Sequence, residues 1–452
     1  MTMNPGKENQ LMIARLLGMD EEEAAALLDV RVVVRAGAET YAVFAKELSE
    51  QLQRTVVLAD DISEADVEIV VGIEPSGELG KVIYISLDDD GATFSETPMP
   101  IGDVPELHGL QIVLGACYAA SYVLGRAISG LPSPSGDFRL SFAAIGADRA
   151  LLEQSIVLTG TALAGAGAVG NGLLRGLRHL DVKGELTVVD PKTIGGGNAN
   201  RCLFFEPGET GPKAEVLSNN AQASFAHLEL KPFVGTFHEY VEREGRVRQV
   251  LVATDSRPVR RSIQNDLPLV VVDASTTGVN EIIVHSHEQP TEGACLACIY
   301  KHVLDEDAKA RDIASGLGIE VSDVDPNGLI GNRVADLIVA AHPDLHKADL
   351  LGKAFDTLFK ELCGEMALLT PSGEQALAPF AFVSNMAGAY LALELVRRTA
   401  GVATTNYMFL DPWRPPYPKL RSFRTRDSDC QFCGKRQTQL AFRAVWPDVF
   451  FD

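Results

Sequence analysis

The sequence predicts an α/β protein made of two domains. Short apolar runs rich in Val and Ile alternate with helical segments along most of the chain, which is the pattern of strands joined by crossover helices. The chain has 452 residues, which is too long for one ordinary domain. A stretch rich in Pro and Ser, LPSPSGD at 131–137, is the expected linker. We therefore expect one domain at 1–135 and a second at 138–452.

The first domain should contain a parallel sheet with helices against it. Its predicted helices and strands are helices at 8–29, 40–53 and 114–128, and strands at 55–60, 67–73 and 81–87. Between these strands and helices we find no glycine-rich loop of the kind that holds phosphate. The first domain is therefore interpreted as a degenerate α/β half.

The second domain should be an open sheet with helices on both faces. The expected strands lie within 155–167, 184–190, 248–255, 267–275 and 280–287, and the expected helices at 171–180, 213–225 and 382–398. Residues 302–362 are charged and helical in pattern, so we predict a helical insertion at about 300–375.

Composition and charge exclude several functions. A hydrophobic content of 46% supports a buried core, and the net charge of −21 argues against nucleic-acid binding and favours solubility and a partner with a basic patch. In the sequence, no uniformly apolar run reaches the roughly 18 residues of a membrane span. The first ten residues, MTMNPGKENQ, lack the apolar core of a signal peptide. We expect a cytoplasmic protein without membrane or nucleic-acid partners.

The cysteines predict a zinc site. Cys295 and Cys298 form C-L-A-C, and Cys430 and Cys433 form C-Q-F-C. Four thiolates complete a closed tetrahedral Zn²⁺ site, which leaves no open position for chemistry. The metal would be structural and would attach the C-terminal segment to a distant loop. The alternatives are two unrelated reduced pairs or a redox C-x-x-C.

A nucleotide site is predicted in the second domain. Gly165, Gly167 and Gly170 form G-x-G-x-x-G between a strand and a helix, where backbone N–H groups approach phosphate closely. Asp190 follows the last glycine by 20 residues, at the end of the next strand. An acid at that spacing reaches a ribose hydroxyl.

Polar residues beyond Asp190 favour a triphosphate over a dinucleotide. Asn198, Asn200, Arg201 and Lys213 supply two amides and two cations, which a dehydrogenase does not need. Asp255 ends another strand, where its carboxylate suits Mg²⁺ beside the phosphates. The alternatives are a helix N-cap for Asp255 and solvated surface charges for Arg201 and Lys213.

These segments resemble a known family. DPKTIGGGNANRC at 190–202, GPKA at 211–214 and ATDSRPVR at 253–260 are similar to the signature of the ubiquitin-activating and ThiF/MoeB adenylyltransferases, as are the two C-x-x-C pairs. The resemblance covers about 150–435. It implies a Rossmann-like adenylation domain that uses ATP, Mg²⁺ and structural Zn²⁺. Its substrate would be the C-terminal carboxylate of a ubiquitin-like or sulfur-carrier protein, which becomes an acyl-adenylate with release of pyrophosphate.

The resemblance also implies a role for individual residues. Asp190 would hold the ribose, Asn198, Arg201 and Lys213 the phosphates, and Asp255 the Mg²⁺. The sequence departs from the family at two positions, because Lys192 replaces the second acid of D-x-D and Cys202 replaces the final Gln.

The arginine-containing helix that the family has just before the glycine loop is not evident here, and an arginine near the N-terminus is the candidate for its role. Arg15, in MIARLL, could supply a phosphate-binding arginine from the degenerate half or from another subunit, or it is an ordinary surface arginine. If Arg15 acts from another subunit, the protein would be a homodimer.

Three cysteines remain as acceptors for a thioester. In the ubiquitin-activating branch the acceptor lies in an insertion like the one predicted here, which favours Cys363 over its alternative as a buried helix-end residue. Cys117 lies in an apolar helix and is expected in the core. Cys202 follows Arg201, whose positive field could lower the thiol pKa, or it is a packing residue.

The sequence therefore favours an activating enzyme for a ubiquitin-like protein, with a conjugating enzyme as a second partner. Its compact pairing of an inactive and an active half resembles the activating enzymes of bacterial ubiquitin-like conjugation operons, some of which act against phage. One alternative is a sulfur-carrier adenylyltransferase without a lasting thioester. Another is a non-catalytic Rossmann-like binding protein.

Overall fold

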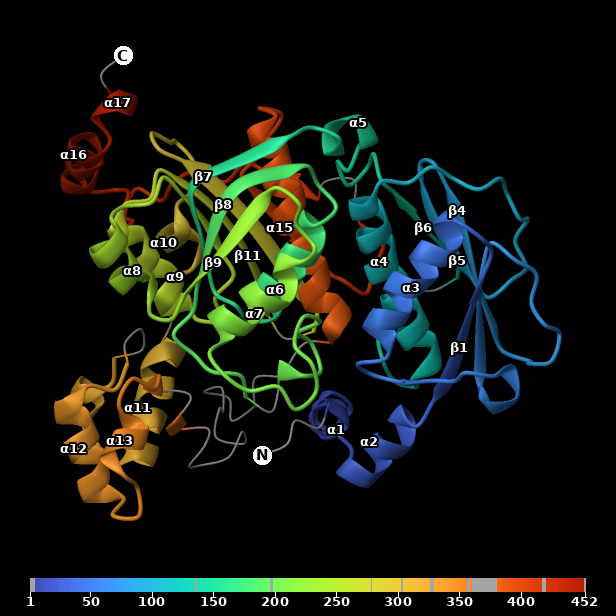
Figure 1. Cartoon of the computed structure of the whole chain (residues 1–452), viewed down its shortest axis with the longest axis horizontal. Helices are drawn as coiled ribbons and strands as arrows, with labels where there is room; N and C mark the ends of the chain where they lie inside the picture. The colour runs from blue at the N-terminus through green and yellow to red at the C-terminus, as the bar shows by residue number, and fades with distance from the viewer. Residues whose placement is uncertain are drawn as a thin grey trace.

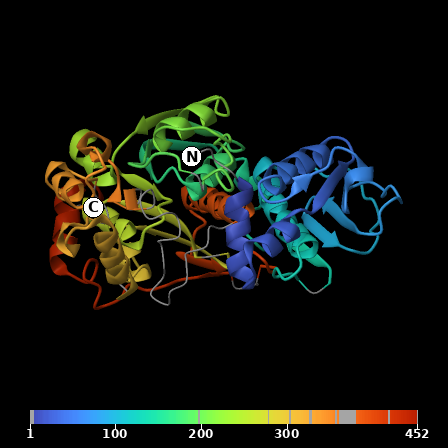
Figure 2. The same cartoon turned by 90° about the horizontal axis from the view of Figure 1, so that it is seen from below.

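The computed structural model describes residues 5–134, 136–195, 198–277, 279–301, 304–325, 329–355, 358–359, 380–416 and 420–450. Two sheets define two lobes, an N-terminal lobe drawn in blue and teal and a larger lobe drawn from green to red (Figure 1). Seen from below, helices α1 and α2 (Pro5–Leu17 and Glu21–Leu28) lie between the lobes (Figure 2).

The N-terminal sheet has six strands in the order β2-β1-β3-β4-β5-β6. The bounds are β1 (Arg31–Ala36), β2 (Val57–Leu58), β3 (Val67–Val71), β4 (Val82–Asp88), β5 (Gly91–Ser95) and β6 (Phe138–Ser141), with helices α3 (Thr40–Leu52) and α4 (Gly109–Ala127). The first four strands pair in parallel, as predicted, and β5 and β6 continue the sheet in antiparallel pairs.

Strand β6 corrects the predicted start of the second domain. It pairs with β5 of the first sheet, although residue 138 was expected to begin the second domain. Phe138 packs against Phe94 of β5 with ring centroids 5.2 Å apart, so its apolar face completes the first core. The Pro-rich stretch at 131–137 therefore connects α4 to β6 within the same lobe.

The helix expected over 8–29 is two helices. Gly18 adopts a φ of +69°, a left-handed conformation that ends α1 and that glycine accepts without strain. Asp20 then caps α2, because its carboxylate accepts a hydrogen bond from the Glu23 N–H at 2.8 Å. The break makes α1 an independent element that reaches the second lobe.

The second sheet has eight strands in the order β14-β13-β12-β11-β10-β7-β8-β9. The strands are β7 (Ile156–Ala164), β8 (Val182–Val189), β9 (Leu228–Phe233), β10 (Gln249–Val252), β11 (Val270–Thr277), β12 (Glu281–Glu288), β13 (Tyr407–Leu410) and β14 (Arg421–Ser422). Strands β11, β10, β7, β8 and β9 pair in parallel. Strands β12, β13 and β14 extend the sheet from β11 in antiparallel pairs. The chain winds outward from β7 to β9 and resumes on the other side at β10. The switch point therefore lies between β7 and β10, where open α/β sheets bind ligands.

Helices cover both faces of this sheet. The helices of this lobe outside the insertion are α5 (Arg149–Leu152), α6 (Ala168–Leu177), α7 (Lys213–Gln222), α8 (Phe237–Glu244), α9 (Arg257–Ile263), α10 (Leu296–Ile299), α15 (Ala381–Thr399), α16 (Arg436–Val445) and α17 (Pro447–Phe450). Helix α15 lies directly on α6, and a Cβ on Gly388 would come within 2.2 Å of the Gly172 backbone. Only glycine permits this approach, which fixes α6 in place.

Helix α4 joins the lobes through a common core. Tyr118 of α4 and Tyr390 of α15 share a hydrogen bond of 2.9 Å between their hydroxyls. By length and composition α4 could cross a membrane, but 83% of its most apolar window is buried inside the protein. Its apolar character is explained by its place between the two sheets.

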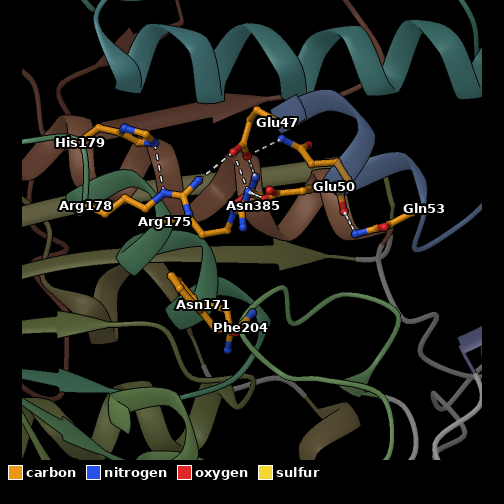
Figure 3. A network of polar contacts seen from close by, with 10 residues as sticks. Glu47, Glu50, Gln53, Asn171, Arg175, Arg178, His179, Phe204 and Asn385 are labelled. Atoms are coloured by element: carbon orange, nitrogen blue, oxygen red, sulfur yellow. Dashed lines mark hydrogen bonds and ion pairs between the residues drawn. The ribbon is translucent and has the colours of Figure 1, made fainter. Parts of the chain in front are cut away.

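Buried charges also join the lobes (Figure 3). Arg175 of α6 donates to Glu47 and Glu50 of α3 at 2.6 and 2.5 Å, and Asn385 of α15 donates to Glu47 at 3.5 Å. Arg175 and Glu47 are only 4% and 5% exposed. Removing one partner of such a pair costs about 3–5 kcal/mol, because the other charge stays buried. The N-terminal lobe therefore holds the helix that follows the glycine loop.

The predicted insertion contains helices α11 (Leu304–Leu317), α12 (Asn332–Ala341) and α13 (Lys347–Leu350). They share a small apolar core of their own, which includes Leu317, Ile338 and Phe355. Figure 1 shows them in orange, at the end of the second lobe away from the N-terminal sheet.

Candidate functional site

The glycine loop lies at the switch point, between the carboxyl end of β7 and the start of α6. Gly165 has a φ of +111°, and a Cβ there would meet the Ala253 carbonyl oxygen at 2.7 Å. A Cβ on Gly170 would meet the Gly165 carbonyl oxygen at 2.2 Å. Gly167 has open space above it, with nothing within 4 Å of its ideal Cβ. Two glycines thus close the turn, and the third leaves room for a ligand at the start of α6.

Asp190 stands beside this loop at the end of β8. Its carboxylate is buried, and its Oδ2 and Oδ1 accept backbone N–H bonds from Ala166 and Lys192, both at 2.8 Å. Asp190 therefore fixes the shape of the glycine loop. A carboxylate offers about four acceptor sites, so two remain for a ligand hydroxyl.

The segment that carries the predicted phosphate residues packs against α6. Asn171 of α6 donates to the Gly167 carbonyl at 3.0 Å and accepts from the Phe204 N–H at 3.0 Å (Figure 3). Asn198 is buried and its Oδ1 accepts from the Gly195 N–H at 2.8 Å, so it shapes its own turn. Arg201 is half-buried and donates through Nη1 to Asn200 Oδ1 at 3.1 Å.

Lys213 begins α7 and lies against the segment that follows Asp190. Its backbone N–H donates to the Lys192 carbonyl at 2.9 Å, and the Ile194 N–H donates to the Gly211 carbonyl at 2.9 Å. This short pairing carries the half-buried Lys213 side chain to the region of Arg201. The positive charges of Arg201 and Lys213 both act on the Cys202 thiol.

Asp255 follows β10 and faces the glycine loop from the other side. It forms an ion pair with Lys192, whose Nζ lies 3.3 Å from Asp255 Oδ2, and its own side chain is 72% exposed. The N-cap of α9 is Ser256, whose side chain accepts from the Val259 N–H. The alternative of Asp255 as a helix cap is therefore wrong.

Arg260 holds the loop that carries Asp255, a role that the sequence analysis did not predict. It is buried, and its Nη2 donates to the Thr254 and Ala274 carbonyls while its Nη1 pairs with Asp273. Tyr300 completes the network by lying under the guanidinium and bonding to Asp273. Burial lowers the pKa of Arg260, although arginine remains charged. The sequence signal that could have predicted this role is the position of Arg260 at the end of the family motif ATDSRPVR.

The N-terminal lobe reaches the phosphate segment through residues that the sequence did not single out. Arg54, just after α3, donates to the Ala199 and Phe205 carbonyls at 2.9 and 3.3 Å. Asn9 of α1 accepts from Asn200 Nδ2 at 3.2 Å. Arg15, the predicted residue of α1, is exposed, and Asn9 of the same helix contacts the segment. No local motif announces Asn9 or Arg54, because their partners are more than 140 residues away.

Two of the three candidate acceptor cysteines lie among the described residues, and both are buried. Cys117 is fully buried in α4, as expected, and burial raises its pKa. Cys202 is also fully buried, and burial raises its pKa although Arg201 and Lys213 act in the opposite direction. Of the two alternatives for Cys202, its burial favours the packing residue over the activated thiol, since desolvation is the larger effect on its pKa. Cys363 lies outside the described residues.

The four remaining cysteines come together as predicted. The Sγ atoms of Cys295, Cys298, Cys430 and Cys433 all lie within 4.8 Å of one another. Three of their Sγ–Sγ distances are 3.7, 3.8 and 3.4 Å, and a tetrahedral zinc with bonds of about 2.3 Å separates its sulfurs by about 3.8 Å. The Asp427 N–H donates to Cys298 Sγ, as expected for a thiolate ligand. The cluster can hold one zinc ion, which would attach the C-terminal segment to α10.

The fold and this arrangement define a nucleotide-binding α/β protein, and comparison with known proteins names its family. Residues 140–432, more than half of the chain, match the ThiF family, and residues 3–148 match the E1 N-terminal domain. The chain therefore belongs to the ThiF family, and its N-terminal part matches the domain of that name in E1 enzymes. The resemblance noted in the sequence is confirmed.

Individual relatives are distant. The uncharacterized protein y4jF of Sinorhizobium fredii is 28% identical over 305 residues, which cover 63% of this chain and 58% of that protein. This chain thus spans little more than half of that relative's length. Crystal structures of E. coli MccB with MccA-N7isoASN and with ATP are 13% and 12% identical, with TM-scores of 0.37 and 0.36. They cover 64% of this chain and 71% and 68% of their own chains, and the family assignment rests on the ThiF match alone.

Proposed function

We propose that this protein uses ATP to adenylate the C-terminal carboxylate of a ubiquitin-like protein and then passes the acyl group to a cysteine of its own. The observation that carries the proposal is the meeting of three strand ends at one place. The glycine loop after β7, Asp190 after β8 and Asp255 after β10 surround the open space at Gly167. Substrates of open α/β sheets bind at such a switch point.

Each residue has a role that its position supports. Asp190 binds the ribose through the acceptor sites that the backbone leaves free. The α6 N-terminus, Arg201 and Lys213 bind the phosphates and neutralise charge that develops as pyrophosphate departs. Asn198 keeps the turn that presents Arg201, since its side chain is bonded to Gly195.

The residues also fit a magnesium ion. Mg²⁺ usually binds one or two carboxylates together with phosphate oxygens and waters, and Asp255 offers an exposed carboxylate beside the phosphate region. When bound there, the ion would neutralise charge on the phosphates. Lys192 already supplies one positive charge at the same carboxylate.

The reaction needs two displacements. A carboxylate oxygen of the partner attacks the α-phosphorus of ATP, forming the acyl-phosphate bond as the bond to the β-phosphate oxygen breaks and pyrophosphate leaves. A cysteine thiolate then attacks the acyl carbon, and AMP leaves with the electron pair of the broken bond. We assign the thiolate to Cys363, because the described alternatives Cys117 and Cys202 are fully buried.

The E1-type N-terminal domain supports a ubiquitin-like partner over the sulfur-carrier alternative. The pairing of an inactive and an active half resembles the activating enzymes of bacterial ubiquitin-like conjugation operons. By this analogy, a conjugating enzyme would receive the acyl group from the thioester. The test is to incubate the chain with ATP, Mg²⁺ and each small protein encoded beside it, and to weigh the intact products. A carrier carrying one AMP supports adenylation, and a carrier joined to this chain by a thiol-sensitive bond supports the thioester. If neither product forms with any carrier, the result favours the alternative of a non-catalytic Rossmann-like binding protein.

A further inference from the structure

The phosphate segment at 198–205 is held by two residues of the N-terminal lobe. Arg54 is 8% exposed, and its guanidinium spans the carbonyls of Ala199 and Phe205, which lie six residues apart in the chain. Arginine suits this task because its planar fork donates two bonds in a fixed geometry. Arg54 therefore closes the segment that carries Arg201.

A second connection runs through two buried side-chain amides, which we call the amide chain (Asn9 and Asn200). Arg201 Nη1 donates to Asn200 Oδ1 at 3.1 Å, and Asn200 Nδ2 donates to Asn9 Oδ1 at 3.2 Å. Asn9 Nδ2 then donates to the Arg54 carbonyl oxygen. Asn9 and Asn200 are 2% and 0% exposed, so water does not compete with these bonds.

The direction of the amide chain is fixed by its two ends. Arginine can only donate and a carbonyl oxygen can only accept, so each amide must turn its oxygen toward Arg201 and its nitrogen toward Arg54. No flipped orientation of Asn9 or Asn200 satisfies both ends. The position of the Arg201 guanidinium is thus tied to a residue near the N-terminus of the other lobe.

Arg201 keeps donors for a ligand under this arrangement. Its guanidinium carries five N–H groups, of which one is used by Asn200. An arginine that is already oriented loses less rotamer freedom when it meets a phosphate, so binding and catalysis gain from the constraint.

We propose that Asn9 and Arg54 are positioning residues that orient Arg201 toward the phosphates of ATP. This inference rests on the proposed function, and it gives the N-terminal lobe a part in the site that does not require Arg15. The lobe acts through its contacts with the 198–205 segment and needs no phosphate loop of its own.

The test is a double-mutant cycle with the full chain, with the affinity for a non-hydrolysable ATP analogue and Mg²⁺ measured by calorimetry. Asn9→Ala should weaken binding about fivefold, the change that corresponds to one hydrogen bond. In the Arg201→Ala background the same substitution should have no further effect, because its influence passes through Arg201. A role limited to folding would instead give the same loss in both backgrounds.

Two further variants keep the test decisive. Gln53→Ala is the matched control: within the part of the chain that the structure describes, the side chain of this neighbour of Arg54 donates only to the Glu50 carbonyl, so the variant should bind the analogue like the wild type. If Asn9→Ala does not fold, Arg54→Lys keeps the charge, loses the fork and should show the same pattern. Wild-type affinity in Asn9→Ala, or equal losses in both backgrounds, would overturn the proposal. A wild-type chain that does not bind the analogue would overturn the proposed function, and this inference with it.

Discussion

Lys192 Nζ lies 3.3 Å from Asp255 Oδ2 and joins the loops that follow β8 and β10. The family signature has a carboxylate where this chain has Lys192, so a like-charge neighbour of Asp255 is replaced by an ion-pair partner. The Asp255 side chain is 72% exposed, and an exposed pair of this kind is worth about 0–1 kcal/mol. The pair is therefore weak enough for a metal ion to displace it.

Lys192→Ala should lower the Mg²⁺ concentration that half-saturates the reaction, because the lysine and the metal compete for Asp255. The shift should be at most about fivefold, which corresponds to about 1 kcal/mol, and it should shrink at high salt. The measurement is a Mg²⁺ titration of pyrophosphate exchange, with direct Mn²⁺ binding followed by electron paramagnetic resonance. Lys183→Ala removes a similar exposed pair, with Asp181, and serves as the control. A half-saturating concentration that stays the same or rises would show that Lys192 does not compete with the metal.

The zinc cluster predicts a fixed metal content. The purified protein should contain about one zinc per chain, and Cys430→Ser should lower the zinc content and the melting temperature together. Cys117→Ser is the matched control, because it changes a fully buried cysteine of α4 and should lower stability without losing zinc. Elemental analysis that finds no zinc in well-folded wild-type protein would contradict the assignment.

His179 predicts a pH dependence of stability. Burial, with Arg178 nearby, lowers its pKa from 6.5 to about 3, and its Nε2 accepts a hydrogen bond from Arg178 Nε at 3.2 Å (Figure 3). The folded state keeps the imidazole neutral, while the unfolded chain takes up a proton below pH 6.5. This contribution is therefore fully present above pH 6.5 and is lost as the pH falls toward 3.

The experiment compares urea unfolding of the wild type and of His179→Gln between pH 7 and about 4.5. As the pH falls, the wild type should lose up to about 1.4 kcal/mol of unfolding free energy per pH unit relative to the variant. A difference that is constant over this range would mean that His179 takes up protons equally in the folded and unfolded states, which contradicts its lowered pKa.

The acceptor cysteine is tested separately from adenylation. Cys363→Ala should keep pyrophosphate exchange and lose the thiol-sensitive adduct with the carrier, whereas Cys202→Ala should keep both because its thiol is buried with a raised pKa. Non-reducing gels run beside the exchange assay provide the measurement. An adduct that persists in Cys363→Ala and disappears in Cys202→Ala would move the acceptor to Cys202. Exchange without any adduct in the wild type would favour the sulfur-carrier alternative.

The parts of the site that could be predicted from the sequence are those set by local chain geometry. Gly165 and Gly170 are required by a turn and a helix contact within a few residues, and Asp190 follows them at the spacing of one crossover. The cysteine pairs were also readable, since each C-x-x-C is a local turn. Such features leave a pattern in neighbouring positions.

The parts that could not be predicted depend on contacts between distant segments. Asn9 and Arg54 act across the two lobes, and nothing in their own neighbourhood distinguishes them from surface residues. Strand β6 was assigned to the second domain because the Pro-rich stretch before it has the composition of a linker. The two alternatives for Cys202 could not be separated from the sequence, because its charged neighbours are visible there and its burial is not.

The most direct test of the adenylation site is ATP–pyrophosphate exchange with carrier and Mg²⁺, measured for the wild type, Arg201→Ala, Asp255→Ala and Arg243→Ala. Arg243 is 75% exposed on α8 and serves as the control for loss of an arginine. We predict that the wild type and Arg243→Ala exchange alike, while Arg201→Ala and Asp255→Ala lose on the order of 10²–10³ in rate and stay folded. Exchange by Asp255→Ala at the wild-type rate, or no exchange by the wild type with any carrier, would contradict the account.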